Sequence, residues 1–234
     1  MPNRSDIQNE ILKYKNAGQD VLRRRYQKNL HKYTKRDTIV YASAYASGKN
    51  GIPPFALSVS TEDIQGFMTA INGLKGDKLD LILHSPGGSL EAAEQIVNYL
   101  RAKYSHIRAI IPQNAMSAAT MIACAADVII MGKQSAIGPI DPQITIPTQH
   151  GPFTAPAQAI LDEFDKAKEE VIAKPQVAPL WVSKMKNYPP GIFNICKDTV
   201  ELAKEKVDQW IYQYMFKSDE KLKQKAKEIA GWLG

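Results

Sequence analysis

The chain has 234 residues, of which 44% are hydrophobic, and a formal net charge of +6, which suits one α/β domain with an appendage. The longest apolar run, around residues 118–131, is interrupted by Asp127 and is too short to cross a bilayer. No secretory signal opens the sequence, so we expect a soluble, cytoplasmic protein. The two cysteines, Cys124 and Cys196, have no metal-binding spacing, and we expect both to stay reduced.

Most of the positive charge lies at the start of the chain. Residues 1–36 contain ten Lys/Arg and three Asp/Glu, whereas the rest of the chain has 20 basic and 21 acidic residues. Apolar and aromatic residues recur at helical spacing between residues 6 and 33, which predicts one long amphipathic helix. We expect its apolar stripe to pack on a second copy of the chain in a homo-oligomer, with a membrane surface or an acidic partner as alternatives. We do not expect the arm to bind nucleic acid.

Strand-like and helix-like segments alternate through the middle of the chain. The strand-like segments are residues 38–47, 79–84, 107–112 and 128–131, and the helix-like segments are residues 61–73, 89–100, 117–126 and 156–173. This alternation predicts parallel strands joined by right-handed crossovers, with the ligand site at the carboxyl ends of the strands. We expect residues 128–131 to form a buried strand, and the Gly/Pro-rich residues 132–142 to form a loop that lines the site.

Prolines divide the last part of the chain. We predict a short helix near residues 177–187, a longer helix over residues 192–216, and a final lysine-rich helix that Ser218 caps. The chain is therefore expected to consist of three parts. These are a basic helical arm (1–36), a catalytic core (37–175) and a C-terminal helical extension (176–234).

The most informative stretch begins with an almost wholly apolar run, residues 79–84, which ends in Ser-Pro-Gly-Gly. Pro86 cannot continue a central strand, and Gly87 and Gly88 let backbone N–H groups face a ligand. Ser89 then starts a helix. The pattern recurs after the next strand, where a polar turn leads to a helix that starts at Ser117. Because parallel strands end at the same edge of a sheet, we expect the glycine turn and Ser117 to lie together.

Three segments, LDLILHSPGG, NAMSAATMIACAADVIIM and SAIGPIDPQI, resemble in order and spacing the Clp protease and signal peptide peptidase (crotonase-like) superfamily. The resemblance covers about residues 38–175 and is closest to the branch named serine dehydrogenase proteinases. It implies a ClpP/crotonase-like α/β fold of repeated ββα and βα units around a parallel sheet, to which the arm and the C-terminal helices attach. In this superfamily a glycine-rich turn supplies oxyanion donors, and a serine at a helix start is the nucleophile.

Ser117 matches that nucleophile. A serine hydroxyl is a weak nucleophile, so it needs a base within hydrogen-bond reach and N–H donors for the oxyanion. The N–H of Ala118 is one expected donor, and that of Gly88 or Gly87 is the other. The alternative is that Ser117 only caps its helix. The paired glycine turn and the resemblance favour the nucleophile.

The general base is where the sequence departs from its relatives. Clp-type proteases have a histidine near the place of Asp141, and signal peptide peptidases have a lysine near the place of Gln158. The candidates are Lys168 or Lys166, Asp141 itself, and His84 at the end of its strand. A lysine base needs burial to lower its pKa, so we favour Lys168, which lies nearer the apolar stripe of its helix. Each candidate also has a structural explanation, as a solvated helix face, a turn former or a core histidine.

The sequence therefore predicts a serine peptidase that cleaves peptide or protein substrates through an acyl-enzyme. Two alternatives stay open, an acyl-CoA enzyme of the crotonase type and a non-catalytic oligomeric scaffold with a degenerate site. The sequence contains no Cys/His/Asp cluster and no phosphate-binding Gly-Lys-Ser/Thr motif, so we expect no metal and no cofactor.

Overall fold

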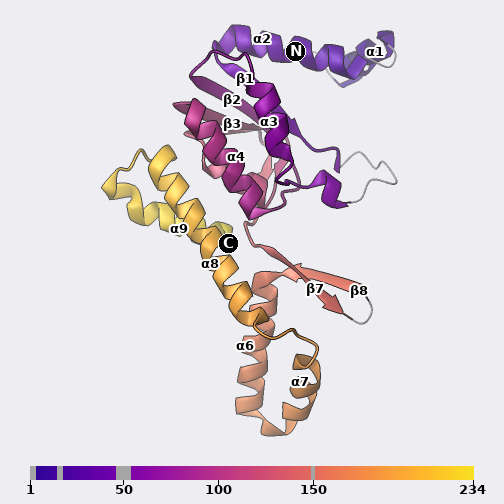
Figure 1. The fold of residues 1–234 in the computed structure, drawn as a ribbon, viewed down its shortest axis with the longest axis vertical. Helices are drawn as coiled ribbons and strands as arrows, with labels where there is room; N and C mark the ends of the chain where they lie inside the picture. The colour runs from indigo at the N-terminus through magenta and orange to yellow at the C-terminus, as the bar shows by residue number, and fades with distance from the viewer. Residues whose placement is uncertain (1–3, 15–17, 46–53, 149–150) are drawn as a thin grey trace.

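The structure is a computed structural model that describes residues 4–14, 18–45, 54–148 and 151–234. An α/β body with a parallel sheet forms its upper part in Figure 1, and a β-ribbon and a helical hairpin form its lower part. The sheet strands are β1 (Asp37–Ala42), β2 (Lys78–His84), β3 (His106–Ile111) and β5 (Val128–Met131), in the order β1-β2-β3-β5. Each adjacent pair is parallel, as the alternation of segments predicts. Strand β1 ends at Ala42, whereas the sequence predicted a strand up to residue 47.

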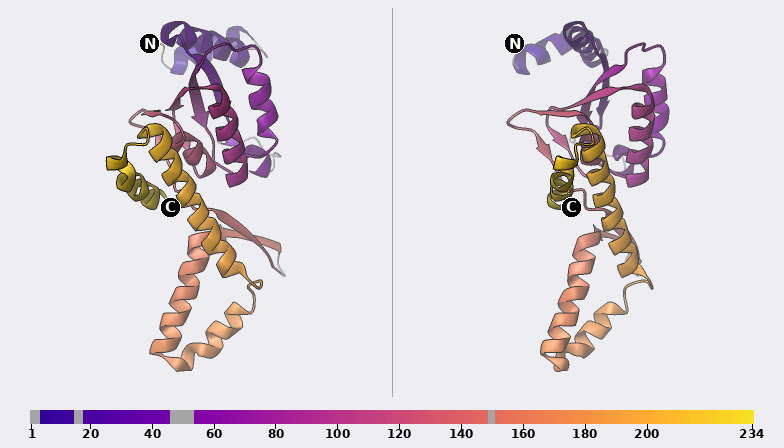
Figure 2. Two further views of the ribbon diagram at one scale, coloured as in Figure 1. Left: turned by 60° about the vertical axis from the view of Figure 1, so that its left-hand side comes forward. Right: turned by 90° about the vertical axis from the view of Figure 1, so that its left-hand side faces the viewer.

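Two helices, α3 (Asp63–Ile71) and α4 (Leu90–Lys103), lie side by side on one face of the sheet (Figures 1 and 2). Both were predicted, and α4 starts at the expected cap, because the Ser89 side chain accepts a hydrogen bond from the Ala92 N–H at 3.1 Å. The inward face of α4 is formed by the apolar positions of its helical repeat, Ala92, Ala93, Ile96, Val97 and Leu100.

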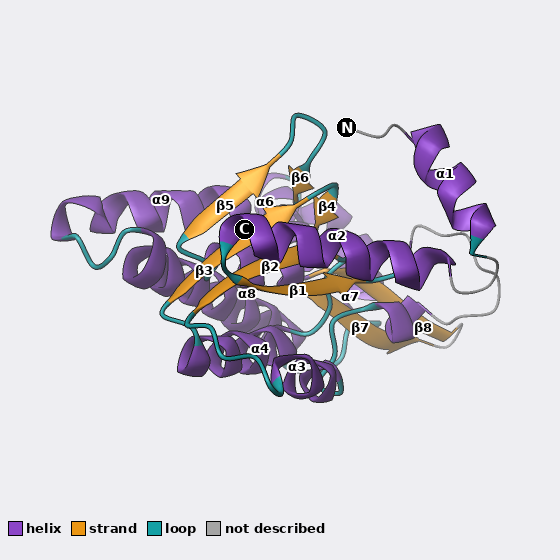
Figure 3. Ribbon diagram, turned by 90° about the horizontal axis from the view of Figure 1, so that it is seen from above, coloured by secondary structure: helices purple, strands orange, loops and turns teal. Residues whose placement is uncertain are grey.

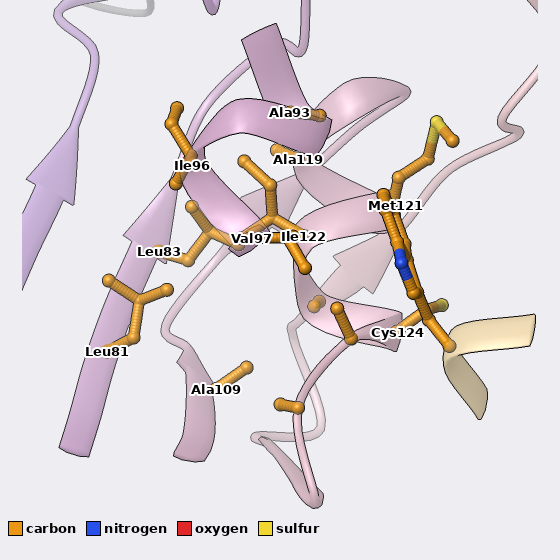
Figure 4. Packing of buried hydrophobic residues seen from close by; sticks show 14 of the residues in the cluster. Leu81, Leu83, Ala93, Ile96, Val97, Ala109, Ala119, Met121, Ile122 and Cys124 are labelled. Atoms are coloured by element: carbon orange, nitrogen blue, oxygen red, sulfur yellow. The ribbon is translucent and has the colours of Figure 1, made fainter. Parts of the chain in front are cut away.

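The core lies between this helix layer, the sheet and the short helix α5 (Ala118–Cys124). Every residue of α5 is buried, which its run of small side chains permits. Figure 4 shows Leu81 and Leu83 of β2 near Ile96 and Val97 of α4 and near Ile122 of α5. Cys124 is buried in this core, and burial raises the pKa of its thiol to about 12, so this cysteine is a packing residue.

The N-terminal arm consists of two helices, α1 (Arg4–Lys13) and α2 (Gly18–Thr34), so the prediction of one continuous helix is wrong (Figure 3). A Cβ on Gly18 would lie only 2.2 Å from the carbonyl oxygen of Ile11. One helix could not bring these residues together, because seven residues span about 10 Å along a helix axis. The glycine therefore permits α1 to fold back against the start of α2.

Strand β5 differs from its prediction in burial. It is the last strand of the sheet order, and Val128, Ile130 and Met131 are each about two-fifths exposed. Its apolar sequence led to the expectation of a strand covered on both faces. Composition does not distinguish such a strand from an apolar strand at an edge.

The lower part contains a ribbon that the sequence did not predict, formed by β7 (Gln143–Thr148) and β8 (Gly151–Pro156). It leads into α6 (Ala157–Ala173), which was predicted, and then into α7 (Ala178–Met185). Figures 1 and 2 show α6 and α7 as a hairpin that projects away from the sheet. The strands of the ribbon contain three prolines, which are poor strand formers, and this explains why the pattern was missed.

Helix α8 (Ile192–Trp210) runs from the hairpin back to the α/β body and continues as a π-helix, Ile211–Met215 (Figure 1). Helix α9 (Lys223–Leu233) follows a 3₁₀ turn that Asp219 caps, so the predicted cap at Ser218 is wrong. Side chains of α8 and α9 enter the main core, and α6 packs on α8, so the helices on both sides of residue 175 contact each other. The division at residue 175 stays a prediction. Within the described ranges, no helix is both long and apolar enough to cross a membrane.

Candidate active site

The turns that follow β2 and β3 are joined at the carboxyl end of the sheet. The Ser85 N–H donates to the carbonyl of Asn114 at 3.1 Å, and the Met116 N–H donates to the carbonyl of Ser85 at 3.0 Å. A second pair of short strands, β4 (Asn114–Ala115) and β6 (Ala136–Ile137), continues this edge. These hydrogen bonds fix the glycine turn next to the start of α5. The sequence predicts this arrangement, because the two preceding strands are parallel and end at the same edge of the sheet.

Ser117 has an unusual backbone conformation, with φ 48° and ψ −122°. Non-glycine residues avoid positive φ, and such a conformation costs about 1–3 kcal/mol unless its surroundings fix it. The Ser117 side chain makes no capping hydrogen bond to α5 and is partly exposed. The capping role weighed for this serine is therefore absent from the structure.

Gly87 lies directly against Ser117. Its φ is +94°, and a Cβ built on it would be 2.6 Å from the Ser117 Cβ and 2.4 Å from the Met116 carbonyl oxygen. No side chain fits in this space. The glycine turn therefore contacts the nucleophile candidate at van der Waals distance, which agrees with the predicted meeting of the two turns.

Gly88 is fixed by Val59, a residue that the sequence analysis did not single out. The Val59 N–H donates to the Gly87 carbonyl at 2.7 Å, and the Ser89 N–H donates to the Val59 carbonyl at 2.9 Å. This pairing turns the Gly88 N–H away from Val59. Only the prediction of a strand over residues 58–60 could have indicated this contact from the sequence.

The two glycines differ in what their N–H groups do. The Gly87 N–H donates to the Ser85 hydroxyl oxygen at 3.2 Å. In the described part of the chain, neither the Gly88 N–H nor the Ala118 N–H donates a hydrogen bond to another residue. Two uncommitted backbone donors beside a serine hydroxyl are the elements of an oxyanion hole.

The loop after β5 is attached to α5 by Thr120. The wholly buried Thr120 hydroxyl bonds to the Ala115 carbonyl at 2.7 Å and accepts from the Gly138 N–H at 3.1 Å. Gly138 also contacts the Met116 side chain, because a Cβ there would lie 2.0 Å from the Met116 Cε. The predicted loop thus borders the turn that carries Ser117.

Comparison with known proteins gives the family. Residues 11–234 match the family model described as ClpP-like SDH-type serine proteinase. The chain belongs to this family. Its match extends beyond residues 38–175, where the sequence resemblance was expected, and includes most of the arm and the C-terminal helices.

Two curated proteins similar to this chain come from Methanocaldococcus jannaschii. The chain is 36% identical to uncharacterized protein MJ0137 over 164 residues, which are 68% of the chain and 54% of that protein. It is 34% identical to uncharacterized protein MJ1495 over 162 residues, which are 66% of the chain and 51% of that protein. The chain thus spans about half the length of these relatives.

Solved structures with partial similarity include a mutant of the membrane-bound stomatin-specific protease 1510-N in complex with a substrate peptide. It is 22% identical, covers 54% of this chain and 53% of its own, and has a TM-score of 0.35. The ClpP protease catalytic domain from Plasmodium falciparum is 13% identical, covers 42% of this chain and 56% of its own, and has a TM-score of 0.31.

His84 contacts the second turn through Asn114 and also contacts Tyr45. Its ring lies 5.1 Å from the Tyr45 ring, and its Nδ1 accepts a long hydrogen bond of 3.4 Å from the Asn114 N–H. Asn114 also donates its side-chain amide to the Tyr45 hydroxyl at 3.1 Å. His84 is therefore only partly buried, and the backbone of the second turn bonds its ring.

Asp141 follows the loop that Thr120 holds. Its side chain is partly buried and accepts a hydrogen bond from the Gln158 N–H at 3.3 Å. Burial raises the pKa of Asp141 above its usual value, against the opposing effects of that hydrogen bond and of the Lys204 charge. A carboxylate with a raised pKa is a stronger base than an ordinary aspartate.

The lysine candidates lie on the projecting hairpin, and the expected burial of Lys168 is wrong. The Lys168 side chain is 54% exposed and pairs with Asp165 at 2.5 Å, and the Lys166 side chain is 67% exposed. Ala167 between them is the buried residue of this turn. The other predicted stripe residues, Ile160, Leu161, Phe164 and Val171, are buried or partly buried, so only the assignment of Lys168 to the stripe is wrong. The desolvation argument no longer supports Lys168.

The parts of the chain that the structure describes hold no group of three or more His, Cys, Asp or Glu side chains suited to a metal ion. The groups that this arrangement offers for chemistry are the Ser117 hydroxyl and the N–H groups of Gly88 and Ala118.

Proposed function

We propose that this member of the proteinase family is an active serine peptidase that forms an acyl-enzyme on Ser117. One observation carries the proposal. Ser117 has φ 48°, and its hydroxyl makes no capping hydrogen bond to α5. It lies against Gly87, where there is no room for a Cβ. A fold has no structural need for a strained serine at this place, whereas a nucleophile must point out of its turn.

The reaction proceeds by attack of the Ser117 Oγ on the scissile carbonyl carbon. The developing oxyanion accepts hydrogen bonds from the N–H groups of Gly88 and Ala118, which are free in the described structure. The base that takes the hydroxyl proton returns it to the leaving amine as the C–N bond breaks. Water then attacks the acyl-enzyme, releases the new carboxylate and restores the serine.

We assign the base to Asp141. The assignment rests on the raised pKa of this carboxyl and on its place after Gly138, which Thr120 and Met116 hold beside the Ser117 turn. His84 is engaged with Asn114 and Tyr45, and Lys168 is exposed and ion-paired. Of the four candidates, Asp141 alone combines partial burial with a raised pKa.

The substrate is a peptide or an unfolded protein segment. An extended peptide satisfies its main chain by pairing with exposed strand edges such as the short strands and turns around Gly88. We also propose a homo-oligomer, because Leu12, Tyr33, Ile172 and Leu180 are each more than 70% exposed. Sedimentation of the full chain at micromolar concentration tests the oligomer, and a monomer would contradict it.

The nucleophile is tested with a fluorophosphonate probe and intact-mass spectrometry. Wild type should gain one adduct per chain, and Ser117→Ala should gain none. Ser89→Ala is the matched control, since it removes the hydroxyl from the other helix start. An unlabelled wild type, or labelling that survives in Ser117→Ala, would reject the serine peptidase. Tight binding of a CoA thioester by an unlabelled wild type would favour the crotonase-type alternative instead.

The base is tested by following peptide turnover against pH. With Asp141 as base, activity should be lost as pH falls through a pKa above the usual aspartate value of about 4, because the protonated carboxyl cannot accept the hydroxyl proton. Asp141→Asn should remove most of the activity, while Lys168→Ala keeps it. His84→Ala and Lys166→Ala complete the series. A wild-type profile in Asp141→Asn would show that the base lies elsewhere.

A further inference from the structure

Thr120 is a buried polar residue in a helix whose other residues are Ala, Met, Ile and Cys. Its side chain has no solvent exposure. Burying a hydroxyl costs free energy unless the hydroxyl is hydrogen-bonded, whereas valine has almost the same shape and carries no such cost. Packing alone therefore does not account for a threonine at this place, and the reason lies in the hydrogen bonds of its hydroxyl.

The Thr120 hydroxyl crosses the turn that contains Ser117. It donates to the carbonyl of Ala115 at 2.7 Å, and Ala115 lies five residues earlier in the chain. Threonine hydroxyls inside helices usually bond to a carbonyl three or four residues earlier, which belongs to their own helix. The bond in this protein instead reaches β4, so it closes the chain over residues 115–120 around Ser117.

The same hydroxyl also fixes the start of the loop after β6. Its oxygen accepts a hydrogen bond from the Gly138 N–H at 3.1 Å and lies 3.0 Å from the Gly138 carbonyl oxygen. Ala115 of β4 and Ile137 of β6 are partners in the short parallel pair. One buried oxygen thus connects α5 to β4 and to the residue that follows β6. A change of conformation in the Ser117 turn would disturb all of these bonds.

The helix itself does not require the positive φ of Ser117. Its carbonyl accepts from the Met121 N–H at 3.1 Å, and the carbonyl of Ser89 accepts from the Ala93 N–H at the same distance, although Ser89 has φ −70°. The helical hydrogen bond is therefore compatible with both conformations. A non-glycine residue at positive φ persists only where its surroundings fix it. The bonds of Thr120 are of this kind, because they lead out of the helix.

We propose that Thr120 is a positioning residue, whose hydroxyl holds Ser117 in the conformation that leaves the serine uncapped. This inference rests on the proposed role of Ser117 as the nucleophile. Without the Thr120 hydroxyl, the turn relaxes towards the conformation of Ser89, in which the serine oxygen accepts from a helix N–H. The oxygen is then displaced relative to the N–H groups of Gly88 and Ala118. Loss of one buried oxygen lowers the reactivity of the serine while the fold remains.

Fluorophosphonate labelling of the full chain tests this role. Thr120→Val keeps the shape of the side chain but loses the hydroxyl, and it should be labelled about a hundredfold more slowly, the effect of a displacement of about 1 Å. Thr120→Ser keeps the hydroxyl but loses a buried methyl group, so it should be less stable and yet be labelled at the wild-type rate. Ile122→Val is the control, because it removes one carbon from the buried face of the same helix and should also keep the rate.

Reactivity should therefore follow the hydroxyl and not the stability, which a purely structural role of Thr120 would not produce. Circular dichroism and urea denaturation are measured on the same samples. If Thr120→Val does not fold, Thr120→Ala takes its place, because a smaller side chain cannot overpack the core. Wild-type labelling of the variant without the hydroxyl, or an equal loss of labelling in Thr120→Ser, would overturn the proposal.

A second measurement needs no peptidase activity. With Thr120 present, Ser117→Gly should be more stable than Ser117→Ala, because glycine adopts positive φ without a steric cost. With Thr120→Val, this difference should disappear, because the turn has relaxed. An unchanged difference would show that Thr120 does not hold the turn. A wild type that is not labelled would reject the peptidase, and the comparison of stabilities would still decide the role of Thr120.

Discussion

Two helices of this protein start with a serine at the carboxyl end of a parallel strand, and the two serines do different things. Ser89 at α4 has φ −70° and ψ 136°, and its hydroxyl accepts from the Ala92 N–H at 3.1 Å and donates to Glu91 at 2.6 Å. Ser117 at α5 has φ 48° and ψ −122° and makes no cap. The same residue type at the same kind of position is a structural cap in one place and a free hydroxyl in the other.

The difference arises from the backbone of the preceding turns. Before Ser89, Gly88 pairs with Val59 and brings the chain into the helix in extended conformation, so the serine hydroxyl reaches back to the helix N–H groups. Before Ser117, Met116 is bonded to Ser85, and Gly87 occupies the space beside the serine. A helix start therefore does not define the role of a serine, and the conformation of the turn does.

The largest expected effect is that of closing the space beside Ser117. Gly87→Ala would place a methyl group 2.6 Å from the Ser117 Cβ, so the serine must move, and a displacement of about 1 Å costs about a hundredfold in rate. Turnover of a peptide substrate measures this loss.

Gly191→Ala is the control for Gly87→Ala. Gly191 also has a positive φ, +80°, but a Cβ there meets nothing within 4 Å. This variant should lose stability without losing turnover. Equal turnover in the two variants would show that Gly87 does not position the serine.

A smaller effect is expected on stability when the strain at Ser117 is removed. Ser117→Gly should be about 1 kcal/mol more stable than Ser117→Ala, because glycine adopts positive φ without a steric cost. Both variants lack the hydroxyl, so the comparison isolates the backbone. Urea denaturation gives the difference. If Ser117→Ala is the more stable of the two, the positive φ at this position does not lower the stability of the protein.

The smallest effect is that of removing the cap at the other helix start. Ser89→Ala should lower the free energy of unfolding by about 1 kcal/mol, the usual cost of an N-cap, and leave fluorophosphonate labelling intact. Thermal unfolding and the labelling rate are measured on the same samples. Loss of labelling with unchanged stability would mean that the roles of the two serines have been exchanged.

The sequence was sufficient to predict the parallel sheet, the two strand–turn–helix units and the meeting of Ser117 with the glycine turn. These features depend on local patterns, such as the apolar run of β2, the two glycines and the periodicity of α4. The choice between Gly87 and Gly88 as a free donor could not be made, since it depends on the pairing of Val59, nearly 30 residues earlier in the chain.

Features that depend on distant contacts were missed. The stripe of α6 buries Ala167 rather than Lys168, because a helix contacts its neighbour through whichever face the neighbour presents. The contact of Gly18 with Ile11 and the exposure of β5 are likewise set by what lies beside them. A cleft at the start of β3 combines residues from three segments of the chain, 101–106, 127 and 213–218, none of which forms a motif.

The exposed apolar edge at β5 affects how the protein behaves in concentrated solution. In the described part of the chain this strand has a neighbour on one side only, so its other side presents unpaired backbone groups, beside half-exposed Ile130 and Met131. Such an edge is a template for adding a strand from another molecule. Here it is only four residues long, which limits the number of hydrogen bonds that an incoming strand can form. A charged side chain at Ile130 should therefore increase solubility at high concentration without altering the site at Ser117.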